Sequence, residues 1–180
     1  MRAIDVRDLI ERPGASRTIH LEEPVPDLRT ELADVPEDAP LAGDLTLESV
    51  VEGIYVHGRV NGTMRMRCAR CLKDFDALFD VAMDELFARD PGPEDDYALA
   101  DDLTLDPEPM VRDAVVLEMP FSPLHRPDCQ GLCPVCGGDR NLGECPGHVE
   151  SDPRWAALDA LLVLDAARTA DPDADDPTSN

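Results

Sequence analysis

The sequence predicts an α+β fold: an antiparallel β-sheet or partly open barrel with two main helices and a zinc-ribbon-like cysteine segment. Three observations lead to this prediction. Alternating apolar and polar residues run through the first half of the chain, two later stretches begin with helix-start signals, and two Cys-x-x-Cys motifs flank the first of those stretches.

The first predicted elements are short and are separated by proline-rich connections. A short helix over residues 5–10 precedes a strand over residues 18–21, and the four prolines within residues 22–40 predict an irregular connection. Alternation resumes at residues 45–47, and residues 50–60 are rich in the β-branched types that favour strands.

Asn61-Gly62 is a strong hairpin signal. We expect a three-residue loop with Gly62 in the left-handed region, because this loop pairs Arg59 with Thr63 and separates two faces cleanly. The face expected to be buried holds Ile54, Val56, Gly58, Met64, Met66 and Cys68. The opposite, polar face holds Tyr55, His57, Arg59, Arg65 and Arg67.

The rest of the chain is predicted to hold one more strand and both main helices. Residues 75–83 place apolar side chains at every second position, and the acidic residues 89–102 predict a flexible loop. Asp106 is the expected cap of a helix that has Pro107 in its first turn and runs to about Met119. The second helix is predicted after Asp152-Pro153, from an apolar stripe of Trp155, Leu158, Leu161 and Leu162.

The composition limits the possible partners. The chain has 16 Lys and Arg against 39 Asp and Glu, and its net charge of −23 repels phosphate backbones and favours basic proteins. No apolar run is long enough for a bilayer, and the N-terminus lacks the apolar region of a signal peptide, so we expect a cytoplasmic protein without a membrane partner. Thiols stay reduced there, so the six cysteines are expected to bind metal or serve redox chemistry.

The two Cys-x-x-Cys motifs, Cys68 to Cys71 and Cys133 to Cys136, predict one structural zinc site. A gap of two residues lets both thiolates of a motif reach one ion from a tight turn, and Gly137 lets the backbone fold around the sulfurs. Four thiolates at about 2.3 Å complete a tetrahedron around Zn²⁺ and leave no open position.

The spacing of the motifs leaves two ligand sets open. Between Cys71 and Cys133 lie 61 residues, more than the roughly 15–20 of an ordinary ribbon, so the favoured set implies an insertion between its halves. One ion is simpler than two, since two ions need about eight ligands. The alternative set is local and consists of Cys129, Cys133, Cys136 and Cys145, with His125 and His148 nearby; Cys129 and Cys145 could also be small core residues.

Several segments carry a resemblance to a known family. They are Gly58-Arg59-Val60, the run from Met66 to Leu72, the run from Cys129 to Gly137, the start Ile4-Asp5-Val6, and Leu117-Glu118-Met119-Pro120. The chain resembles the YceD family, which is named for accumulation of large-ribosomal-subunit RNA, over most of residues 1–150. The resemblance implies a non-enzymatic role in ribosome biogenesis, in supporting rRNA accumulation or processing. We expect one YceD-like domain over residues 1–168, with a metal-binding segment at 120–150, and a disordered acidic tail at 169–180.

The polar strand face is the predicted contact surface for rRNA. Tyr55 and His57 could stack on bases, and the nearby arginines could meet phosphates. The alternative is a solvated face whose arginines pair with the abundant carboxylates. The candidate contact residues are Tyr55, His57, Arg59, Arg65, Arg67 and Arg70.

Two further hypotheses belong to other classes of protein. The acidic surface could hold a basic protein of the large ribosomal subunit, as a chaperone would. An enzyme, either a zinc hydrolase or a dithiol redox protein, is disfavoured, because the four histidines show no His-x-x-x-His spacing and the chain has no glycine-rich phosphate loop or serine elbow. No small-molecule substrate is evident.

Overall fold

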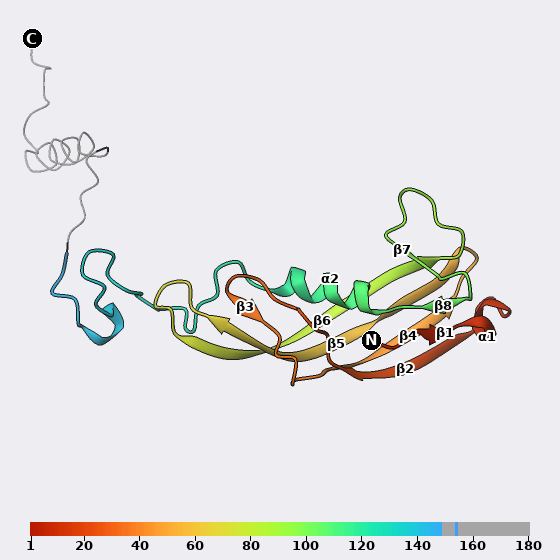
Figure 1. The fold of residues 1–180 in the computed structure, drawn as a ribbon, viewed down its shortest axis with the longest axis horizontal. Coiled ribbons are helices and arrows are strands. Elements are labelled where there is room, and N and C mark those ends of the chain that lie inside the picture. The colour runs from red at the N-terminus through yellow and green to blue at the C-terminus, as the bar shows by residue number, and fades with distance from the viewer. Residues whose placement is uncertain (149–153, 155–180) are drawn as a thin grey trace, which may run out of the picture. The chain divides into compact units, whose positions relative to one another are not determined.

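The computed structural model describes residues 1–148 and Arg154, which fall into two compact units (Figure 1). Unit 1 is Met1–Leu132, and unit 2 begins at Cys133. The second predicted helix and the predicted acidic tail lie outside the described residues, so the domain bounds that depend on them stay predictions.

Among the described residues, unit 1 holds nearly all of the regular structure. Its elements are β1 (Ile4–Asp5), α1 (Arg7–Ile10), β2 (Ser16–Glu23), β3 (Ala33–Asp34), β4 (Leu41–Ser49), β5 (Gly53–Arg67), β6 (Asp74–Ala88), β7 (Tyr97–Ala98), β8 (Thr104–Leu105) and α2 (Glu108–Glu118). In unit 2 the described residues form one short 3-10 helix, η1 (Arg140–Leu142). The predicted α+β class is therefore confirmed.

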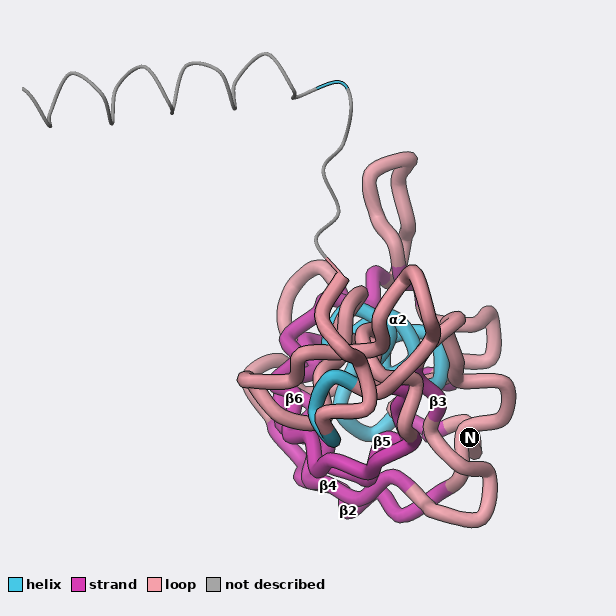
Figure 2. The backbone as a smooth tube through the Cα atoms, turned by 90° about the vertical axis from the view of Figure 1, so that its left-hand side faces the viewer, coloured by secondary structure: helices cyan, strands magenta, loops and turns pink. Residues whose placement is uncertain are grey.

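The main sheet has the strand order β2-β4-β5-β6-β7, with β3 beside the C-terminal end of β5. All of its pairings are antiparallel except β6 with β7, and β1 pairs with β8 in a separate two-stranded sheet. The sheet curves around α2 and stays open, so the partly open arrangement is observed and a closed barrel is not (Figure 2).

The core lies between the inner face of this sheet and α2. Helix α2 begins after Pro107, and the Asp106 carboxylate accepts a hydrogen bond from the Glu108 N–H at 3.0 Å, close to the predicted start. The largest fully buried side chains include Phe87, Leu45, Leu47, Ile54, Val56, Leu105 and Met110. Alternation along β5 and β6 puts one row of each strand into this core, as the sequence predicts.

The predicted hairpin at Asn61-Gly62 is wrong. Strand β5 continues through these residues, with Asn61 opposite Asp80 and Gly62 opposite Phe79. Gly62 is required by packing instead, because an added Cβ would lie 2.8 Å from Leu41 Cδ2 and 3.0 Å from Phe79 Cζ. The predicted inner and outer faces still hold, since a continuous strand also keeps every second residue on one side.

The turn that reverses the chain lies ten residues earlier, between β4 and β5. There the Val50 N–H donates to the Gly53 carbonyl at 3.0 Å, and Val51 is 90% exposed. Valine is a poor turn residue, so local sequence gives little signal here. The position of this turn is set instead by burial of β4 and β5, the two strands that it connects.

Substitutions at Gly62 are expected to distinguish a strand from a hairpin. If residue 62 lies in a strand and faces Leu41 and Phe79, Gly62→Ala should lower the stability by about 1–2 kcal/mol, because the added side chain enters the core. Gly62→Asn should lower it further, because its side chain is larger. A left-handed loop position would reverse this order, since asparagine tolerates that conformation. Urea unfolding of Gly62→Ala and Gly62→Asn measures the order directly.

Candidate metal centres

The first candidate centre is built on the turn between β5 and β6. Cys68 and Cys71 lie in this turn, where the Cys68 N–H donates to the Lys73 carbonyl and the Leu72 N–H donates to the Cys68 carbonyl, each at 2.9 Å. Leu72 closes the turn with a positive φ of 61°. This local geometry aims both thiols toward the same point, as the spacing of the motif predicts.

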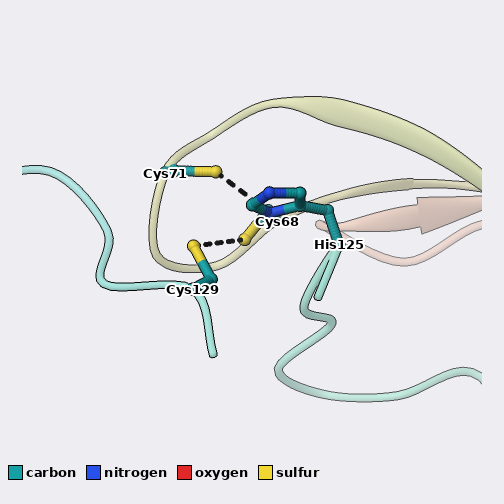
Figure 3. Close-up of side chains that lie close together, drawn as sticks. All are labelled: Cys68, Cys71, His125 and Cys129. Carbon is teal, nitrogen blue, oxygen red and sulfur yellow. Dashed lines mark hydrogen bonds between the residues drawn. The ribbon is translucent and has the colours of Figure 1, made fainter. Parts of the chain in front are cut away.

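A distant segment, residues 123–132, brings the other two ligands. It is held to the turn by three hydrogen bonds: the Ala69 N–H to the Pro123 carbonyl at 2.8 Å, the Leu132 N–H to the Arg70 carbonyl at 2.9 Å, and Arg70 Nη1 to the Cys129 carbonyl at 2.8 Å. His125 and Cys129 thereby approach the turn (Figure 3).

The distances in this first group match a tetrahedral metal site. The ligand atoms of Cys68, Cys71, His125 and Cys129 all lie within 4.8 Å of one another. The Cys68 and Cys129 sulfurs are 3.8 Å apart, and the Cys71 sulfur is 3.3 Å from His125 Nδ1. Two sulfurs bound tetrahedrally at about 2.3 Å from Zn²⁺ are separated by roughly 3.8 Å.

The surroundings of the first group also favour a thiolate. Burial raises the pKa of Cys68, but hydrogen bonds from His125 and from the backbone of the turn lower it to about 5. Burial raises the pKa of Cys71. All three cysteines of this group are buried, so an ion here would be enclosed by protein.

The second candidate centre lies in unit 2 and repeats the same turn. The Cys133 N–H donates to the Gly138 carbonyl at 2.9 Å, and the Gly137 N–H donates to the Cys133 carbonyl at 2.7 Å. Gly137 takes the place of Leu72, with a positive φ of 73°. Counted from its first cysteine, each motif therefore makes the same two hydrogen bonds and has a residue with left-handed backbone at the same position.

The loop after Cys136 returns Cys145 and His148 to this second turn. Asp139 shapes the loop: its carboxylate accepts from the Asn141 N–H at 2.8 Å, and its own N–H donates to the Glu144 carboxylate at 3.0 Å. The ligand atoms of Cys133, Cys136, Cys145 and His148 then lie within 4.8 Å of one another.

Three observations on the second group fit a bound cation with thiolate ligands. Nε2 of His148 is buried and has no hydrogen-bond partner among the described residues, as expected for a ring nitrogen whose partner is a metal ion. A backbone hydrogen bond from Cys136, opposed by burial, lowers the pKa of Cys133 to about 6. Arg140 Nη2 lies 3.9 Å from the Cys133 sulfur and offsets thiolate charge there.

The structure divides the predicted ligands between the two groups. Cys68 and Cys71 fall in the first, and Cys133 and Cys136 fall in the second. The alternative set is also divided, because Cys129 belongs to the first group and His148 completes the second. Each group has three cysteines and one histidine, so the described residues form two Cys/His clusters that could each hold a metal ion.

The predicted contact residues lie mostly on the outer face of β5. Tyr55 and His57 stack there, with ring centroids 5.5 Å apart, while Arg70 lies in the turn and contacts Cys129. Each arginine of this face meets an aspartate of β6. The ion pairs are Arg59–Asp80 at 2.9 Å, Arg65–Asp76 at 4.0 Å and Arg67–Asp74 at 2.8 Å.

The outer face as a whole is acidic. On the four long strands β2, β4, β5 and β6, pairing register and alternation place three arginines and seven carboxylates on this face, a net charge of −4 with histidine neutral. Hydrogen bonding to Arg67 lowers the pKa of Asp74, which keeps that carboxylate charged. The carboxylates of this face are Glu22, Asp44, Glu48, Asp74, Asp76, Asp80 and Asp84.

Comparison with known proteins identifies the family. The model of the family described as large ribosomal RNA subunit accumulation protein YceD matches residues 56–162. The chain belongs to the YceD family. The YceD match begins within β5 and includes all eight Cys and His residues of the two groups.

The similar curated proteins are bacterial, and each is named as an uncharacterized protein. Proteins of Mycobacterium tuberculosis and Mycobacterium bovis are each 41% identical over 168 residues, which cover 88% of this chain and 80% of theirs. A Mycobacterium leprae protein is 37% identical, covering 94% of this chain and 81% of its own. No solved structure matches the YceD chain. None of its described helices combines the length and apolar character needed to span a membrane.

Proposed function

We propose that this chain is a non-enzymatic, cytoplasmic ribosome-biogenesis factor that supports accumulation or processing of large-subunit rRNA. The YceD match over residues 56–162 is the observation that carries the ribosomal role. The two Cys/His groups serve as structural zinc sites in the manner of a zinc ribbon: the first joins two segments that are distant in sequence, and the second closes a local loop.

Zinc is the metal that the ligands favour. Three thiolates and one imidazole form a soft, four-coordinate set of the kind found in structural zinc sites. A bound ion would have all four positions filled by protein and would supply cross-linking rather than chemistry. In the first group the ligands would fasten residues 125–129 to the β5–β6 turn, and in the second they would close the loop from residue 133 to residue 148.

The charge of the outer face favours a basic ribosomal protein over rRNA as the direct partner. The arginines proposed to meet phosphates already pair with aspartates, and the net charge of −4 on that face repels a phosphate backbone. The same negative charge would attract a basic protein and favour its binding. Direct RNA contact through Tyr55, His57 and the arginines is the second candidate, supported by the stacked rings.

The ribosomal role is tested by removing the gene from its host cell. We expect the ratio of large- to small-subunit rRNA to fall and precursors of the large-subunit rRNA to accumulate. A plasmid copy with His20→Gln should restore the ratio, because His20 is exposed and lies outside both Cys/His groups. An unchanged rRNA ratio and precursor pattern after deletion would contradict the proposal.

The choice of partner is tested with charge reversal on the outer face. We expect the double variant Arg65→Glu and Arg67→Glu to retain a large-subunit rRNA fragment on filters as weakly as the wild type does, because these arginines are already paired. Arg12→Glu, in the exposed turn after α1, is the control. Strong wild-type retention that only the double variant loses would instead place RNA on this face.

A further inference from the structure

A groove of about 750 Å³ lies between α2, β6 and β7 in unit 1. Its floor is apolar and includes Met83, Met110 and Ala114. At its border Leu117 is 86% exposed and Val116 is 38% exposed, although both are apolar residues of a helix that covers a sheet. Exposed apolar side chains beside a groove indicate a binding surface.

One wall of the groove is a free strand edge. Strand β6 pairs with β5 along its whole length, but with β7 only at Phe87 and Ala88. Within the described part of the chain, residues 74–86 have no strand on that second side. The five consecutive residues 81–85 all line the groove. Because successive side chains point to opposite faces, such a run means that the groove follows the strand edge and its unpaired backbone groups.

All of the charged side chains that line the rim of the groove, among the residues described, are negative. Five carboxylates line it, and its described lining residues include no lysine or arginine. The arginine of α2, Arg112, is directed elsewhere and donates to the Pro26 carbonyl at 2.9 Å and to Glu108 at 3.0 Å. Partial burial and then its acidic neighbours raise the pKa of Glu85, as expected where carboxylates crowd without a cation. The five are Asp84, Glu85, Asp96, Asp113 and Glu118.

We propose that this groove binds an extended, lysine- or arginine-rich segment of a partner protein, which adds as a strand along the free edge of β6. The inference rests on the proposed function and specifies how a basic partner is held. Backbone hydrogen bonds to β6 supply affinity, alternate apolar side chains enter the floor, and the basic side chains between them meet the rim.

The charge of the chain itself excludes two other occupants. Residues 149–180 carry eight carboxylates and two arginines, so that segment does not complement the rim. A second copy of the chain brings a net charge of −23 toward the same surface. Complementarity therefore requires a partner of opposite charge.

Binding of a synthetic peptide to the full chain tests this proposal. The probe is a short fluorescent peptide in which valine alternates with lysine or arginine, measured by anisotropy. A copy with methyl groups on alternate backbone nitrogens keeps the charge but cannot pair with a strand, and should bind about tenfold more weakly or worse. Replacing the basic residues with glutamate should abolish binding.

Matched protein variants locate the peptide. Glu85→Gln with Glu118→Gln removes two charges from the rim and should weaken binding about threefold or more. Glu31→Gln with Glu37→Gln removes two charges from the loops on either side of β3 and should leave binding unchanged. Equal binding of the methylated peptide, equal loss in both variants, or displacement by an rRNA fragment would overturn the proposal. If gene deletion lowers large-subunit rRNA but no peptide binds, this groove alone is refuted and the ribosomal role stands.

Discussion

Replacing Cys68 with serine is expected to lower the stability of unit 1 by about 3 kcal/mol or more. Cys68 is completely buried and shares one ligand group with Cys71, His125 and Cys129. Structural zinc contributes about 10–16 kcal/mol in isolated finger peptides, and here the separate core of unit 1 retains much of the fold. For a unit of this size the loss corresponds to a fall in melting temperature of roughly 10 °C.

Thermal unfolding with and without a zinc chelator measures this effect. Chelator should lower the melting temperature of the wild type toward that of Cys68→Ser and should change the variant much less. His20→Gln is the matched control, since its ring pairs with Asp44 on the exposed face and lies outside both groups. A Cys68→Ser protein as stable as the wild type, with the same response to chelator, would show that the first group holds no structural ion.

Replacing Gly131 with alanine is expected to lower stability by about 2–4 kcal/mol and to weaken metal binding in the first group. Gly131 has a φ of 75°, and an added Cβ would lie 2.8 Å from the Arg70 carbonyl oxygen. The left-handed conformation costs an alanine about 1–2 kcal/mol, and the collision with backbone adds to it. The collision would push residues 129–132 away from the turn that holds Cys68.

The control for this substitution is Gly14→Ala. Gly14 has a similar φ of 83°, but an added Cβ there would meet nothing within 4 Å. The Gly14→Ala variant should therefore lose only the stability that the left-handed conformation costs an alanine, about 1–2 kcal/mol, and should bind metal normally. Chemical unfolding and competition with a chromophoric chelator separate the two variants. Equal losses in both would mean that the contact between residues 70 and 131 does not support the site.

The alternation of side chains was the most reliable guide to the fold. It placed Ile54, Val56 and Met66 in the core and Arg65 and Arg67 outside, because burial of one sheet face imposes a period of two. The turn was not predictable in the same way. Asn61-Gly62 has ideal turn composition, yet the glycine serves close packing against side chains that are distant in sequence.

The ligand partners needed information that motif spacing does not contain. Each Cys-x-x-Cys motif correctly marks a turn with two ligands, since that part of the site is local. The other two ligands of the first group, His125 and Cys129, lie more than fifty positions from Cys68, and hydrogen bonds from Arg70 and Ala69 hold their segment to the turn. For the second group a local signal existed, because Cys145 and His148 repeat the two-residue gap of a ligand pair.

The acidity of the outer face also depended on pairing. The arginines of β5 looked like a basic patch along the chain, but the register of β6 sets Asp76 opposite Arg65 and Asp74 opposite Arg67. Cross-strand neighbours of opposite charge attract, so the pattern is a stable one for an exposed face. A basic cluster in sequence is therefore not a basic surface until its neighbouring strands are known.

The number of metal ions per chain tests the two-group arrangement most directly. Native mass spectrometry of the full chain should find two zinc ions in the wild type, one in Cys68→Ser, one in Cys133→Ser and none in the double variant. A single ion in the wild type that either substitution alone removes would contradict two separate groups and would favour one site shared by both Cys-x-x-Cys motifs.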